Sequence, residues 1–298
     1  MPTQFKDQTA LEQKVASLEQ MLEMTTSYMS EVESDLKDKK ERLETYNKQF
    51  NRSLSFASII QSSIQPAETK IRNAFKDAIL INKPRDVIGG DLVWLRETEK
   101  YTYLASMDCT GHGVPGALLS MVASFSMDAV IDGSEYSDPK ELLTDFNNQF
   151  CSYFKRHEVE KKDLHHGLDI GVIIHDKVKK TLSFNGTRQS LIYTDTDGVH
   201  SLRGDSAYIG NKNLSLKSSV SVPLGKSHRY FLFSDGIVDQ FGGPRNKKFL
   251  ARRLRELLFK TRKLNLREQK EEILQSLDQW MEGEEQTDDI LLIGFELA

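Results

Sequence analysis

Cysteine is scarce in this 298-residue chain, which holds only Cys109 and Cys151. The two residues are far apart and lack CxxC or Cys/His spacing, so the sequence predicts neither a disulfide framework nor a zinc site. An excess of positive charge is also missing, because 40 Lys and Arg residues stand against 44 Asp and Glu residues, a formal net charge of −4. The net charge therefore indicates neither a nucleic-acid nor a membrane partner.

Long apolar runs are missing as well. We find no stretch that approaches the roughly 20 apolar residues needed to span a bilayer. The N-terminus, MPTQFKDQTALEQK, lacks the basic and then apolar regions of a secretory signal. Together with the few cysteines, these absences predict a cytoplasmic protein.

The first fifty residues are rich in charge and carry a seven-residue apolar repeat. One series is Leu11, Leu18, Val32 and Tyr46, and the other is Val15, Leu22, Met29, Leu36, Leu43 and Phe50. Thr25 and Lys39 interrupt the first series, and the positions between are mostly polar, so the stripe is narrow. The pattern predicts a coiled-coil segment over residues 1–52, most simply in a parallel homodimer with Lys39 as a register device. A single long helix lying on the following domain is the alternative.

A second helical stretch, SLSFASIIQSSIQ, follows directly and places Phe56, Ile60 and Ile64 on one face. It stops at Pro66, which cannot continue a helix interior. We interpret residues 53–66 as a linker helix between the coiled coil and a domain over 67–298. Because no breaker separates it from the heptads, we expect dimerisation or a bound partner to change its pose and, through it, the active site.

After Pro66 the sequence alternates between short β-rich runs and helical patterns. Strands are expected at 78–82, 92–96, 101–107, 168–175, 181–184, 191–194, 230–233 and 290–296, and helices at 114–131, 139–154, 247–260 and 266–280. The strands come in consecutive pairs separated by turn sequences, with helices inserted in blocks. This order predicts an α+β fold of antiparallel sheets with segregated helices.

Aspartate stands beside glycine or a second aspartate at four expected strand ends. These places are Gly89-Gly90-Asp91, Asp108 to Gly113, Ser234-Asp235-Gly236 and Thr287-Asp288-Asp289. Any one of them is more often a simple turn. Together they offer the oxygen ligands that Mg²⁺ or Mn²⁺ prefers. Two such cations would activate water and neutralise a phosphate, and no phosphoenzyme nucleophile is evident, since no histidine is placed to activate Ser234.

The order of four motifs carries a family resemblance. VIGGDLVW (87–94), MDCTGHGVPGALLSM (107–121), FLFSDGIVDQFGG (231–243) and QTDDILLIGFEL (286–297) resemble the bacterial SpoIIE/RsbU-like branch of the type 2C, or PPM, metal-dependent serine/threonine phosphatases. The resemblance implies a layered α-β-β-α sandwich of two antiparallel sheets flanked by helices. It also implies two Mn²⁺ or Mg²⁺ ions and, as substrate, a small regulatory phosphoprotein such as an anti-sigma-factor antagonist of the STAS type. A catalytically idle scaffold of the same fold is the alternative.

The resemblance also assigns roles to single residues. It implies that Asp108 bridges both metals, that Asp91 and the backbone carbonyl of Cys109 bind one ion, and that Asp235 and Asp288 bind the other. Asp289 occupies the neighbouring position and is a substitute for Asp288. Asp108 and Asp235 are the expected catalytic residues, and a metal-bound water is our provisional choice for protonating the leaving group.

Weaker candidates flank these motifs. His112 is either a general acid or a simple loop residue. The general-acid role does not carry over from the eukaryotic enzymes of the resembled family, because they place their histidine at a different position after the aspartate. Arg85 is a phosphate contact or an exposed turn residue, and Asp169 is a ligand of a third metal or a strand-edge residue. The stretch Phe241 to Lys248 (FGGPRNKK) is a basic flap that receives the phosphoprotein, or a solvated loop.

Overall fold

A computed structural model describes residues 3–154 and 167–297, and their side chains from residue 12 onward. One helix, α1 (Thr3–Ile64), runs through both N-terminal segments and ends before Pro66. The chain divides into two units, Met1–Phe56 and Ala57–Ala298. In the first unit the described seam side chains are exposed, from 39% for Val32 to 70% for Tyr46. Leu11's side chain lies outside the described part, and pairing of the seam stays a prediction.

Two five-stranded antiparallel sheets form the second unit. The first sheet has the order β1 (Asp77–Lys83), β12 (Ile290–Glu296), β9 (Arg229–Phe233), β6 (Ser190–Thr194) and β7 (Val199–Arg203). The second has the order β2 (Leu92–Glu97), β3 (Tyr101–Cys109), β4 (Leu168–Asp176), β5 (Thr181–Thr187) and β8 (Val220–Val222). Sequence-distant strands are thus neighbours, and β12 joins β1 to β9.

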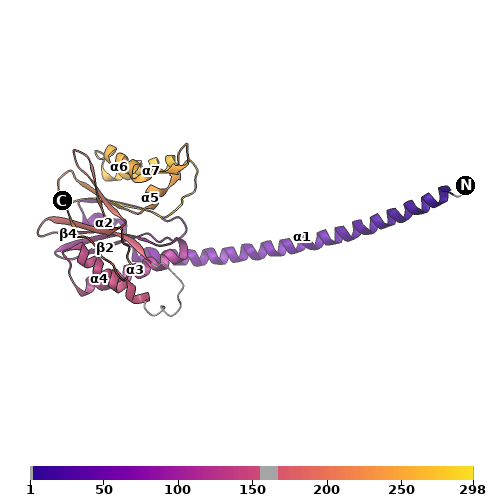
Figure 1. The fold of residues 1–298 in the computed structure, drawn as a ribbon, viewed down its shortest axis with the longest axis horizontal. Helices are drawn as coiled ribbons and strands as arrows, with labels where there is room; N and C mark the ends of the chain where they lie inside the picture. The colour runs from indigo at the N-terminus through magenta and orange to yellow at the C-terminus, as the bar shows by residue number, and fades with distance from the viewer. Residues whose placement is uncertain (1–2, 155–166, 298) are drawn as a thin grey trace. The chain divides into compact units, whose positions relative to one another are not determined.

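Helices cover the outer faces of both sheets (Figure 1). The pair α3 (Gly113–Gly133) and α4 (Pro139–Phe154) packs on the second sheet, and α6 (Leu250–Lys260) and α7 (Leu266–Met281) pack on the first. Alternate residues of each strand therefore enter different cores: Tyr103 faces α4 residues such as Phe146, whereas Leu104 joins Leu232 between the sheets. This confirms the predicted α+β sandwich.

Several elements differ from the sequence prediction. Short α2 (Glu68–Ala74) and the edge strands β7 and β8 were not predicted, because they bury few apolar side chains. The helix expected at 247–260 begins at Leu250, so its first turn was wrong. Lys247–Lys248 instead forms strand β11, paired with β10 (Phe241–Gly242) across a turn in which Asn246 has a positive φ of 42°.

The apolar content of α3 also differs from expectation. Within the described residues, this helix alone is long and apolar enough to cross a membrane by composition, although half of its most apolar window is buried. Its side chains Ala123 and Met127 are fully buried in the core beneath the second sheet. Packing in the sandwich therefore explains its composition.

Candidate active site

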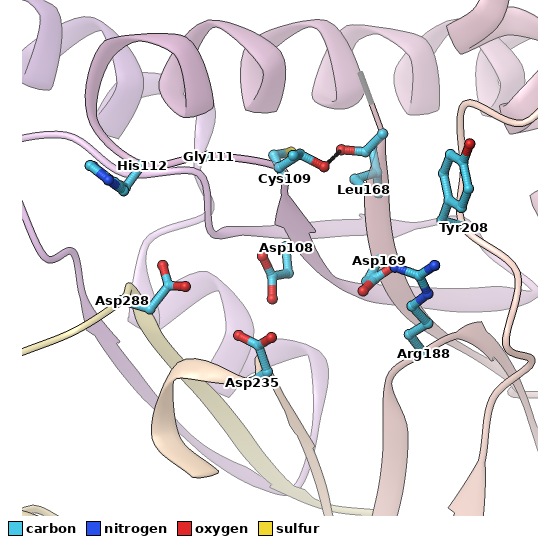
Figure 2. Close-up of a pocket in the computed structure, with 12 residues that line it drawn as sticks. Asp108, Cys109, Gly111, His112, Leu168, Asp169, Arg188, Tyr208, Asp235 and Asp288 are labelled. Carbon is cyan, nitrogen blue, oxygen red and sulfur yellow. Dashed lines mark hydrogen bonds between the residues drawn. The ribbon is translucent and has the colours of Figure 1, made fainter. Parts of the chain in front are cut away.

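Four aspartates converge where both sheets end (Figure 2). Asp108 closes β3 and pairs directly across the sheet with Asp169 at the start of β4. Asp235 follows β9 at the N-terminus of the short helix α5 (Gly236–Asp239), and Asp288 comes just before β12. Since β9 and β12 are neighbours, the last two carboxylates meet the first two at one edge. The four line a cavity of about 540 Å³.

The negative charge of the aspartate cluster exceeds the positive charge of the side chains around it. Burial, followed by the charges of Asp235, Asp288 and Asp169, raises the pKa of Asp108 well above its usual value. Burial and then Asp288 raise the pKa of Asp235, and burial raises the pKa of Asp169 to about 6. Among the described residues lining the cavity, Arg188 is the only lysine or arginine. Such a cluster favours bound cations.

Asp91 extends the cluster into the interior. Its side chain is only 5% exposed, and the hydroxyl of Ser234 donates a 2.6 Å hydrogen bond to it. Burial and then the charge of Asp108 raise the pKa of Asp91 well above its usual value. Ser234 is thereby engaged in positioning a carboxylate, which agrees with its exclusion as a nucleophile.

Asp289 differs from its neighbour Asp288. Asp288 is exposed in the cavity wall, whereas Asp289 is 3% exposed. Its two carboxylate oxygens accept hydrogen bonds from the backbone amides of Arg85, at 2.7 Å, and Gly90, at 2.6 Å. The Asp289 carboxylate therefore fixes the loop that carries Asp91. A Cβ on Gly89 would lie 2.5 Å from it, so a larger residue there would displace this carboxylate.

The backbone around Cys109 is held equally tightly. A Cβ on Gly90 would lie 2.7 Å from the carbonyl oxygen of Cys109, and one on Gly116 would lie 2.1 Å from that of Gly111. These contacts bring the Cys109 carbonyl beside the loop of Asp91. Burial, reinforced by Asp108, raises the pKa of the Cys109 thiol well above its usual value, so the side chain is a poor nucleophile.

The weaker candidates take different positions. His112 lines the cavity at its rim (Figure 2). Its Nδ1 lies 3.0 Å from a carboxylate oxygen of Asp86. Arg85 is not among the lining residues, and its guanidinium donates to the carbonyl of Thr287 at 3.3 Å. The Arg85 side chain thus ties the C-terminal loop to the loop before Asp91.

Arg188 is a lining residue that sequence reasoning missed. It sits in the β5–β6 turn with a positive φ of 53°, and its Nε donates to the carbonyl of Ser206 at 3.2 Å. Its guanidinium lies 5.3 Å from the ring centre of Tyr208, and its charge partly opposes the rise in the pKa of Asp169 that burial causes. No motif marks this position, because only the fold brings β5 to the edge where β3 and β9 end.

The donor set fits hard cations. It consists of carboxylates and a nearby backbone carbonyl, the oxygen ligands of Mg²⁺ and Mn²⁺. In the described part of the chain, however, no three Asp, Glu, His or Cys side chains are arranged closely enough to hold a metal ion together. The fit therefore rests on the chemistry of these oxygen donors.

The raised pKa values predict how pH changes the stability of the metal-free protein. A carboxyl whose pKa is higher in the folded state stabilises the fold at low pH, and that stability is lost as pH rises through the folded value. For Asp91 we expect the melting temperature of metal-free protein to fall by a few °C as pH rises from about 5, just above the unfolded-state pKa of about 3.9, to about 8, since each kcal/mol shifts it by about 2–4 °C. Calorimetry should show a smaller fall in Asp91→Asn; an equal fall would contradict this.

Comparison with known proteins identifies the family. The sequence profile described as stage II sporulation protein E (SpoIIE) matches residues 98–298. The chain belongs to the SpoIIE family. A comparison with curated protein sequences gave no significant match.

Solved structures place this SpoIIE-family chain among the PP2C phosphatases. The SiaA-PP2C domain of Pseudomonas aeruginosa is 30% identical, with a TM-score of 0.77, over 85% of this chain and 98% of that one. The SpoIIE phosphatase domain and regulatory fragment of Bacillus subtilis are 15% identical, with a TM-score of 0.57, over 73% and 62%. The serine/threonine phosphatase of S. agalactiae is 12% identical, with a TM-score of 0.55, over 74% and 99%. The last two share the fold alone.

Proposed function

We propose that the protein hydrolyses phosphoserine or phosphothreonine in a regulatory protein, using two divalent cations held by the aspartate cluster. The observation that carries this proposal is the cavity in which Asp108, Asp235 and Asp288 meet opposite Arg188. Asp108 is central, because its carboxyl interacts with the charges of both Asp91 and Asp235. In this proposal Asp91 and the Cys109 carbonyl serve one ion, and Asp235 and Asp288 serve the other.

Different residues around the cavity have different roles in the proposed reaction. When bound, the cations would lower the pKa of a water and neutralise charge on the phosphate. RsbX, 17% identical with a TM-score of 0.50, is one fold neighbour whose structure contains magnesium. Asp289 and Ser234 hold the Asp91 loop and its carboxylate, and Asp289 acts here as a positioning residue rather than a ligand. Arg188 supplies a cation for phosphate oxygens on the open side of the cavity.

The substrate and setting follow the family. One fold neighbour contains the RsbU and RsbW domains of a protein from Mycobacterium tuberculosis. The substrate that we propose, a regulatory phosphoprotein of the STAS type, is the one that the sequence resemblance implies. We propose a cytoplasmic enzyme that dimerises through the exposed seam of α1. An idle scaffold is disfavoured because a structural role alone does not require Asp108, Asp235 and Asp288 to line the same cavity.

Hydrolysis of para-nitrophenyl phosphate and of a phosphoserine peptide tests the proposal. We expect turnover with Mn²⁺ or Mg²⁺, loss of turnover on chelation with EDTA, and recovery when metal is returned. A protein that is folded yet inactive on both substrates with either ion would show the scaffold interpretation to be correct.

The linker helix reaches this site through Gln61. The Gln61 side chain is 8% exposed, and its amide donates to the carbonyl of Gly89 at 2.6 Å and to the hydroxyl of Ser120 at 3.0 Å. Gly89 lies two residues before Asp91 in the same loop, and Ser120 lies on α3. A change in the pose of the linker helix would therefore move a ligand loop, which supports our proposal that this helix regulates metal occupancy.

Gln61→Ala is expected to weaken Mn²⁺ activation about tenfold, because residues that orient metal ligands typically contribute 10- to 100-fold in affinity. The measurement is the Mn²⁺ concentration that gives half-maximal hydrolysis of para-nitrophenyl phosphate. The exposed neighbour Ser62, changed to alanine, is the matched control. Equal Mn²⁺ dependence in the two variants would refute the role of Gln61.

A further inference from the structure

Positive charge is concentrated in one short segment, which the net charge of the chain conceals. Residues 244–267 contain ten of the 40 Lys and Arg residues but only one of the 44 acidic residues, Glu256. An even distribution would place about three basic residues there. This basic segment covers strand β11, helix α6 and the connection to α7.

The fold presents much of this charge to solvent. Helix α6 buries Leu254 and Leu258 in the core beneath the first sheet and exposes its opposite face. We define the basic surface by its exposed members, which are Arg245, Lys247, Lys248, Arg252, Arg253, Lys260, Lys263 and Arg267. Most of their charge is not neutralised: Arg252 pairs with Glu256, Lys248 with Asp239 and Arg267 with Glu271, whereas the other five have no ion pair within the described residues.

The basic surface begins at the rim of the candidate active site. Asp235 caps α5, which ends at Asp239, and Asp239 forms a 2.7 Å ion pair with Lys248. The backbone amide of Phe249 then donates to the carbonyl of Gln240 at 2.9 Å, which fixes the start of α6 beside α5. A molecule with its phosphate in the cavity would therefore meet this surface next.

We propose that the basic surface docks an acidic face of the phosphoprotein substrate. This inference rests on the proposed function and extends the expected flap at 241–248 along α6. A protein partner fits better than a membrane, because Leu254 and Leu258 of α6 are buried and only Leu250 among its large apolar side chains is exposed, whereas an interfacial helix exposes a whole apolar face. A protein partner also fits better than nucleic acid, because the surface adjoins a carboxylate-lined cavity. When that cavity holds no cations, its carboxylates repel a polyanion. Complementary charge would mainly speed association and select the partner.

Two phosphoserine peptides of the same length test the proposal, one with four glutamates about ten residues from the phosphoserine and one with glutamines there. We expect the acidic peptide to have a kcat/KM about tenfold higher at low salt, with the preference shrinking in 0.5 M NaCl as screening increases. The variant Arg252→Gln/Lys260→Gln/Lys263→Gln should lose the preference. Lys70→Gln/Lys179→Gln/Lys226→Gln, which removes the same charge from exposed sites elsewhere, should keep it.

Binding of the labelled peptides, measured by fluorescence anisotropy, separates this proposal from the proposed function. Selective binding of the acidic peptide by an inactive protein, lost in the α6 variant, would support the basic surface and overturn the phosphatase proposal. Equal turnover of both peptides by the wild type would overturn the basic surface alone. Sedimentation with phosphatidylserine vesicles, lost in the α6 variant and without any peptide preference, would assign the surface to a membrane and likewise overturn it.

Discussion

Asp108→Asn is expected to reduce metal-dependent phosphate ester hydrolysis at least about a thousandfold. Asparagine keeps the size of the side chain but removes the charge placed between the two proposed cation positions. Loss of metal-based charge stabilisation is worth several kcal/mol, and each 1.36 kcal/mol is tenfold in rate. The measurement is kcat/KM for para-nitrophenyl phosphate at saturating Mn²⁺.

The melting temperature of the same variant shows whether activity is lost because the metal site is damaged or because the protein unfolds. The metal-free Asp108→Asn protein should melt no lower than the wild type at pH 8, because the substitution relieves repulsion from Asp235 and Asp288. Asp197→Asn, in the exposed β6–β7 turn, removes one charge away from the cavity and should leave activity unchanged. An active Asp108→Asn protein would contradict the assigned role.

Arg188→Ala is expected to weaken substrate binding by about 10- to 100-fold. A hydrogen bond to a charged group contributes about 1.5–3 kcal/mol, and Arg188 is the sole Lys or Arg among the described cavity residues. The effect should appear in KM for para-nitrophenyl phosphate and in the inhibition constant of inorganic phosphate, with Mn²⁺ activation unchanged.

Two further variants distinguish phosphate binding from loop support. Arg188 also holds the Ser206 carbonyl, so a purely structural role would lower the melting temperature without changing phosphate inhibition. Arg188→Lys should restore part of the binding, because it returns the charge without the bidentate geometry. Arg203→Ala, exposed on β7, is the control. Unchanged phosphate inhibition in Arg188→Ala would disprove the assignment.

The sequence was most informative where local patterns decide structure. The strand ends that carry Asp91, Asp108, Asp235 and Asp288 were predictable, because each aspartate follows or precedes an apolar run beside a turn residue. The approach of Asp108, Asp235 and Asp288 in one cavity follows from sheet pairing, above all β12 beside β9, which spacing alone does not reveal. The order of the four motifs supplied this information, because the family that they resemble implies that these aspartates share one site.

Long-range contacts explain what sequence reasoning missed. Nothing local marks Arg188, which reaches the cavity only because the second sheet places β5 beside β4. The difference between Asp288 and Asp289 also depends on a contact across almost two hundred residues, from Asp289 to the Gly90 amide. Likewise, the net charge concealed the basic surface, because acidic residues elsewhere balance it.

Calorimetric titration of metal-free protein with Mn²⁺ tests the central claim most directly. The account predicts two ions bound per chain in the wild type, with fewer in Asp108→Asn at the same concentrations. Absence of Mn²⁺ and Mg²⁺ binding in a folded wild-type protein, or identical binding by wild type and Asp108→Asn, would contradict the claim that this aspartate cluster is a two-cation phosphatase centre.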